Sequence, residues 1–283
     1  MVVFVIFSSC FFWVVRRSLL SNYNYVEFNH MLNPVECLKK EDVIKVYNSE
    51  AWLLTPNQGD CFIFDIHQDK AYEQCKIVKS SLLILNRVSV HIKSERVIFR
   101  SLKLARLSKL LAFMDMAFGK NSVKVKSPHW MALELDDPEI CEDIKSCERW
   151  FLKQYMNPTE EFTFFISMLR QMESYCVIQF LFNQSRSGNT LIELGENYGV
   201  SYSHFRRLCN HALGGKVKNE LRIWRMAQSL LENIEKDGNL TQLALNNGYA
   251  SSSHFSNEIR EMMGVSPRDL SNIIRLASIQ NEN

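Results

Sequence analysis

The feature that most constrains this chain is a repeat within its last hundred residues. The segment LIELGENYGVSYSHFRRLCNHALGG (191–215) resembles LTQLALNNGYASSSHFSNEIREMMGV (240–265). The leucines and the first glycine align at an offset of 49, and the Ser-His-Phe triplet and the last glycine at 50, because the second copy has one extra residue. A repeat of this length indicates a structural unit that occurs twice.

Each copy has the pattern of two helices joined by a tight turn. Two leucines three residues apart begin a short helix, and Gly199 or Gly248 then permits the turn. The hydroxyl of Ser201 or Ser251 can cap the helix that follows. The sequence therefore predicts two helix-turn-helix units.

The second helix of each unit has an apolar face and a polar face. The residues expected to be buried are Phe205, Leu208 and Cys209 in the first unit, and Phe255, Ile259 and Met262 in the second. The opposite face offers hydroxyl, amide and guanidinium groups that suit base edges in a major groove. It comprises Tyr202, Ser203, Arg206 and Arg207 in the first unit, and Ser252, Ser253, Ser256, Asn257 and Arg260 in the second.

A helical segment at 216–231 joins the two units. Extended over 217–234 it would span about 27 Å, close to one DNA turn of roughly 34 Å. Both recognition helices are therefore expected in successive major grooves on one face of DNA, at a non-palindromic site of about 20 bp.

The net charge of +2 argues against a nucleic-acid partner, but the average conceals the distribution. Residues 198–225 contain six bases and one acid, whereas 226–283 contain four bases and seven acids. Two further stretches contrast in the same way: 76–126 is strongly basic and 134–148 strongly acidic. These two are expected to be solvated faces that partly neutralise each other; the alternative is a surface for a protein partner.

The first half of the chain predicts a small mixed α/β domain. It contains no phosphate-binding loop, metalloprotease motif or nucleophile elbow, so no enzyme is expected. His204 and His254 have no carboxylate or cysteine nearby, so neither a metal site nor a cofactor is expected. Strands are predicted at 61–67, 81–92 and 96–102, and helices at 104–118, at 140–155 and from Thr159 onward.

The first thirty residues are unusual. Residues 2–15 are apolar except for Ser8 and Ser9, and as a helix would span roughly 21 Å, short of a bilayer core. Three interpretations remain open: a true start near Met31, which we favour, a short anchor in the inner membrane, or an apolar packing arm. The eight cysteines are scattered without a Cys-x-x-Cys pair, which is typical of reduced thiols.

Residues 159–283 resemble the DNA-binding domain of AraC/XylS-type transcription regulators. The signature comprises Ala244, Gly248-Tyr249, Ser251, Ser253-His254-Phe255 and Gly264-Val265-Ser266-Pro267. The segments 201–209, 212–216 and 221–231 further resemble the InvF/MxiE branch, whose members activate type III secretion genes. This second resemblance extends from Met31 to about Ala277.

The resemblance implies an α+β chain with three parts: an extension at 1–30, a regulatory or partner-binding domain at 31–158, and an all-α DNA-binding domain at 159–283. It implies a cytoplasmic activator that binds promoter DNA, RNA polymerase and a secretion chaperone of the tetratricopeptide type. The alternatives are a membrane-tethered regulator and a partner-binding anti-activator with weak DNA contacts. The base-reading candidates are Ser203, Arg206, Arg207, Ser253, His254 and Asn257, and the phosphate-backbone candidates are Lys216, Lys218, Arg222, Arg225 and Arg260.

Overall fold

A computed structural model describes residues 31–69, 71–119, 128–214, 216–236, 244–246, 248–269 and 272. The chain divides into two compact units. Among the described residues, the first unit comprises 31–115 and 128–176, and the second comprises 116–119 and the residues from Val177 onward.

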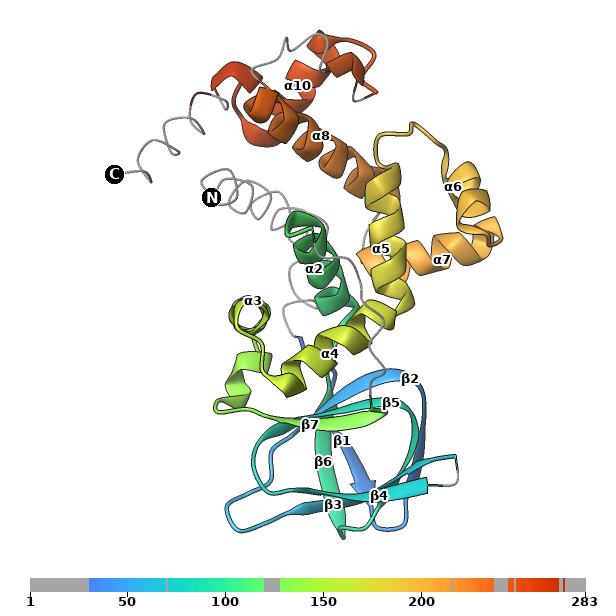
Figure 1. Ribbon diagram of the computed structural model, residues 1–283, viewed down its shortest axis with the longest axis vertical. Coiled ribbons are helices and arrows are strands. Elements are labelled where there is room, and N and C mark those ends of the chain that lie inside the picture. The colour runs from blue at the N-terminus through green and yellow to red at the C-terminus, as the bar shows by residue number, and fades with distance from the viewer. Residues whose placement is uncertain are drawn as a thin grey trace. The chain divides into compact units, whose positions relative to one another are not determined.

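The first unit contains a curved, antiparallel sheet of seven strands in the order β1-β6-β2-β5-β3-β4, with β7 also paired to β5 (Figure 1). The predicted strands are present as β3, β5 and β6, while β1, β2, β4 and β7 lack a clear alternating pattern. The bounds are β1 Glu36–Lys39, β2 Val43–Leu54, β3 Phe62–Gln68, β4 Ala71–Ile77, β5 Ser81–Ile92, β6 Arg96–Ser101 and β7 Trp130–Glu134.

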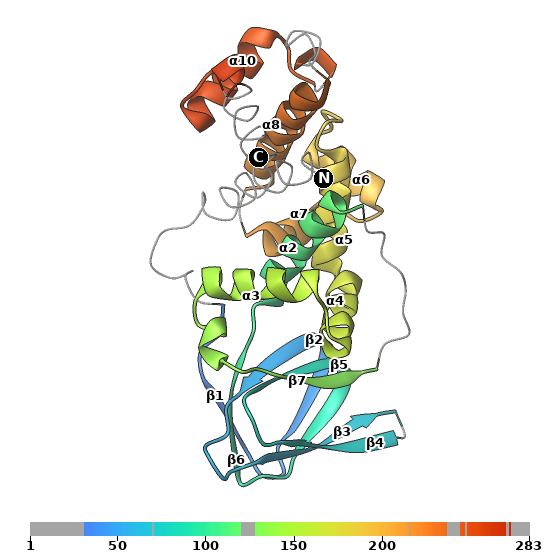
Figure 2. The ribbon, with the colours of Figure 1, turned by 60° about the vertical axis from the view of Figure 1, so that its left-hand side comes forward.

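The longest strands are buried differently along their length. In β5, Ser81–Leu85 are all buried, whereas from Val88 to Ile92 only alternate side chains are buried. β2 likewise ends in four consecutive buried residues, Ala51–Leu54. A continuous buried run means that both faces of the sheet are covered there. Figures 1 and 2 show α2 (Leu104–Ala117), α3 (Ile144–Met156) and α4 (Glu160–Gln171) gathered at this end.

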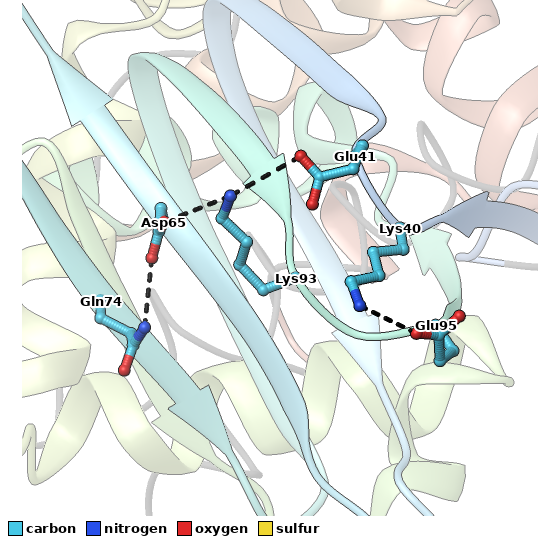
Figure 3. Close-up of polar contacts among 6 residues, drawn as sticks. All are labelled: Lys40, Glu41, Asp65, Gln74, Lys93 and Glu95. Atoms are coloured by element: carbon cyan, nitrogen blue, oxygen red, sulfur yellow. Dashed lines mark hydrogen bonds and ion pairs between the residues drawn. The ribbon is translucent and has the colours of Figure 1, made fainter.

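The other end of the sheet keeps one face in solvent, where its polar side chains form a mixed-charge array (Figure 3). The Nζ of Lys93 lies 3.7 Å from Asp65 and 3.8 Å from Glu41, and Lys40 pairs with Glu95 at 3.0 Å. The Lys40–Glu95 pair is exposed and therefore contributes little to stability. Further ion pairs link the basic and acidic stretches, as expected for faces that neutralise each other: Lys79–Glu134, Arg100–Glu142 and Arg106–Glu148.

Four helices meet at the buried carboxylate of Asp115, which is 1% exposed. It accepts two hydrogen bonds from Arg170, both at 2.7 Å, and one each from Tyr155 (2.9 Å) and Tyr175 (2.7 Å). These bonds compensate for removing the charge from water. Because Arg170 and Tyr175 both bind it, α4 and the start of α5 (Glu173–Gln184) belong to the first unit. The structural division therefore falls after residue 176, later than the boundary expected at 158/159.

Two helix boundaries differ from the sequence expectation. The helix expected from residue 140 begins at Ile144, because Asp143 accepts a hydrogen bond from the Ser146 amide and caps it; a 3₁₀ turn, Pro138–Cys141, precedes it. The helical stripe after Thr159 is interrupted at Met172, whose backbone is extended, although no Gly or Pro marks the break.

The second unit contains helices α6 (Leu191–Tyr198), α7 (Tyr202–Leu213), α8 (Val217–Lys236) and α10 (Ser252–Met263). At about 1.5 Å per residue α8 is roughly 30 Å long, in accord with the predicted linker helix. The predicted fold class, a mixed α/β domain followed by an all-α domain with two helix-turn-helix units, is confirmed.

No helix in the described part of the chain is long and apolar enough to cross a membrane, and the apolar segment 2–15 lies outside that part.

The described cysteines are all unbridged. Burial raises the pKa of Cys75 to about 11 and that of Cys209 to about 12, so both thiols stay protonated at neutral pH.

Candidate DNA-binding interface

The first helix-turn-helix unit is built by a tight crossing of α6 and α7. Gly199 adopts a positive φ of 85°, and the Ser201 hydroxyl accepts a hydrogen bond from the His204 amide. A Cβ on Gly195 would lie 3.3 Å from the Cβ of Phe205, so the crossing leaves little room for a larger side chain there. The repeat has Ala244 at the same position, so a small residue at this point of both copies is a sequence signal of close packing.

The polar face of α7 is exposed as predicted. Phe205 and Cys209 are fully buried, Leu208 is half-buried, and the Phe205 ring packs on Tyr198 and Phe180. The predicted groove-facing residues Tyr202, Ser203, Arg206 and Arg207 are all exposed.

The cations around α7 remain available to a ligand. An Nη of Arg207 lies 2.8 Å from Nδ1 of His204, one turn earlier, which holds the guanidinium along the helix. Arg206, Lys216 and Lys218 are exposed, and within the described residues none of them forms an ion pair. This part of the unit therefore presents uncompensated positive charge to an anionic partner.

The second helix-turn-helix unit repeats this packing with a different surface. Ser251 caps α10, the Phe255 ring packs on Tyr249, and Phe255, Ile259 and Ala244 are fully buried. Met262, also expected in this core, lies outside the residues whose side chains are described. Of the predicted polar face, Ser253, His254, Asn257 and Arg260 are exposed, while Ser252 and Ser256 are partly exposed.

Two of the residues predicted to contact phosphate, Arg222 and Arg225, instead bind groups within the helical unit of the chain. Arg222 donates from Nε to Glu258 at 2.6 Å and from an Nη to Glu261 at 2.7 Å. These bonds raise the pKa of Arg222. Arg225 donates to the carbonyl oxygen of Ser185 at 3.2 Å and lies 5.9 Å from the centre of the Tyr249 ring. The sequence pattern showed two cations on a helix, but it did not show which groups would face them.

Comparison with known proteins agrees with this geometry. The family described as a helix-turn-helix domain matches residues 194–272. The chain is 52% identical to the invasion protein InvF of Salmonella typhi and Salmonella typhimurium over 205 residues, which cover 72% of this chain and 95% of InvF. It belongs to the InvF/MxiE branch of the AraC-type regulators. The transcriptional regulator MxiE of Shigella flexneri is 36% identical over 180 residues, covering 62% of this chain and 85% of MxiE.

This AraC-type chain is also similar to solved structures at low identity. ToxT from Vibrio cholerae, bound to (E)-4-(8-methylnaphthalen-1-yl)but-3-enoic acid, is 12% identical with a TM-score of 0.36; the match covers 87% of this chain and 99% of ToxT. The C-terminal domain of AraT, a response regulator from Geobacillus stearothermophilus, is 24% identical with a TM-score of 0.32, over 36% and 84% of the two chains.

Proposed function

We propose that this protein is a sequence-specific DNA-binding activator of type III secretion genes. The observation that carries the proposal is the pair of helix-turn-helix units with exposed polar recognition faces, in a chain 52% identical to InvF. Recognition helices α7 and α10 enter successive major grooves, and α8 sets their separation. The preferred site is non-palindromic and about 20 bp long.

Within this proposal the contacts divide into two classes. Bases are read by Tyr202, Ser203, Arg206 and Arg207 on α7 and by Ser252, Ser253, His254 and Asn257 on α10. The phosphate backbone is bound by Lys216, Lys218 and Arg260, which are exposed. Arg222 and Arg225 leave this second class, because each already binds a group of its own unit.

We assign partner binding to the sheet-bearing first unit. The proposed partners are RNA polymerase and a type III secretion chaperone of the tetratricopeptide type, and the proposed compartment is the cytoplasm, where promoter DNA lies. A chaperone that relieves weak DNA affinity would suit a chain whose net charge is only +2.

A gel-shift experiment tests the proposal. The purified full chain is titrated onto a secretion-operon promoter and onto a shuffled duplex of equal length, with and without the chaperone. We expect a shift selective for the promoter that strengthens when the chaperone is present. Absence of binding at low salt under both conditions would contradict the proposal and favour a partner-binding anti-activator.

A further inference from the structure

An ion pair network joins the linker helix α8 to the second recognition helix. Arg222 on α8 binds Glu258 and Glu261 on α10 through two different nitrogens, at 2.6 and 2.7 Å. The Glu258 side chain is only 4% exposed, whereas that of Arg222 is 45% exposed. A buried carboxylate on a DNA-reading helix needs a compensating cation, and Arg222 supplies it.

The geometry of this network controls how α10 is turned. Glu258 and Glu261 lie one helical turn apart, so a single guanidinium that binds both sets the rotation of the helix about its axis. Asn257, a base-reading candidate, is adjacent to Glu258 and therefore points about 100° away from it around the helix. Holding Glu258 against α8 thus determines the direction in which Asn257 faces.

The aligned positions of the first helix-turn-helix unit carry no carboxylates. The repeat alignment places Leu208 where the second unit has Glu258, and His211 where it has Glu261. The orientation of α7 comes instead from apolar packing, including the close contact of Gly195 with Phe205.

We propose that Arg222 is a positioning residue for the second recognition helix and not a phosphate contact. This inference rests on the proposed function, in which α10 reads bases. Two carboxylates already bind the Arg222 guanidinium, so its charge is compensated within the protein and its attraction to phosphate is weakened. Specificity in the half of the site that α10 reads then depends on a side chain that touches no base.

The experiment uses the full chain and a duplex enriched from a random-sequence pool by the wild-type protein. Three variants are compared: Arg222→Gln, Glu258→Gln and the double variant, with Lys218→Gln, one turn earlier on the exposed side of α8, as the matched control. Each Arg222 or Glu258 variant should bind about tenfold more weakly, and the double variant no more weakly than either. Footprint protection should be lost only in the half of the site bound by α10.

The salt dependence separates positioning from phosphate contact. Arg222→Gln should leave the slope of log affinity against log salt unchanged, whereas Lys218→Gln should make it shallower by about 0.9. Tighter binding by Glu258→Gln together with a shallower slope for Arg222→Gln would overturn the proposal, because removing a carboxylate beside a phosphate contact favours DNA.

A measurement without DNA distinguishes this proposal from the function on which it rests. Hydrogen exchange of Arg222→Gln should accelerate in 252–263 and stay unchanged in 202–213, which also shows that the chain is folded. Unchanged exchange in α10 would overturn the positioning role. If the wild-type chain enriches no sequence but exchange in α10 accelerates, the proposed function fails while Arg222 still positions α10.

Discussion

The two helix-turn-helix units share a scaffold and differ in where they carry charge. Phe205 and Phe255 are both fully buried at equivalent positions, and Ser201 and Ser251 cap the two recognition helices in the same way. Around α7 the cations are exposed and form no ion pair with another described residue, whereas α10 carries two carboxylates that form ion pairs with Arg222. The repeated core therefore leaves the surface free to specialise, and under the proposed function the first helix-turn-helix unit would supply electrostatic affinity and the second polar readout.

The largest expected effect tests whether the two cores are equivalent. Phe205→Ala and Phe255→Ala should each destabilise their own unit by about 3–5 kcal/mol, because each removes a fully buried ring. Hydrogen exchange measured separately over α7 and α10 would show the loss in the mutated unit. Similar losses would support the shared scaffold, and a loss in only one unit would break the comparison.

The next effect tests the two polar faces with a matched pair of substitutions. Arg207 and Asn257 occupy equivalent positions in the repeat. Arg207→Ala should weaken specific binding by about 1–3 kcal/mol and relax discrimination at one base position. Asn257→Ala should relax a base in the other half of the site without changing the salt slope, because it removes no charge. Equal losses for Arg207→Ala on specific and random DNA would instead indicate a phosphate contact.

The salt dependence of binding tests where the electrostatic affinity lies. If the two exposed lysines of the first helix-turn-helix unit, Lys216 and Lys218, neutralise one phosphate each, they contribute about −1.8 to the log–log slope. Replacing both lysines with Gln should remove that contribution. In the second unit Arg260→Gln should change the slope by only about 0.9, and a larger change there would reverse the assignment.

The smallest effect concerns the cap of α6. Glu193 accepts a hydrogen bond from the Thr190 amide, which lowers the pKa of Glu193. A lowered folded pKa means that the cap is at full strength above the unfolded pKa of about 4.3 and is lost as pH falls through the folded value. Exchange in α6 should therefore rise at acidic pH in the wild type. Glu193→Gln should remove that pH dependence, and an unaltered profile would assign it to another group.

Much of the helical unit from Val177 onward could be predicted because its sequence signals are local. The turn glycines, the capping serines and the apolar faces of α7 and α10 all act within about a dozen residues, so the repeat was sufficient to place them. The exposure of Arg206 and Arg207 follows from the same helical period. In the sheet-bearing unit only β3, β5 and β6 had a clear alternating sequence pattern, because strands such as β2 are covered on both faces over part of their length.

Tertiary structure decided the features that depend on groups far apart in the sequence. The break at Met172 accompanies the binding of Asp115 by Arg170 and Tyr175, from helices separated by more than fifty residues along the chain. Arg222 faces carboxylates 36 and 39 residues away, so composition alone showed a basic linker where the folded chain has an ion pair network. The sequence by itself determined the two reading units and their caps, since these need only neighbouring residues. Which cations stay free for an anionic partner was decided by the fold, since a charge is compensated by whatever lies beside it in space.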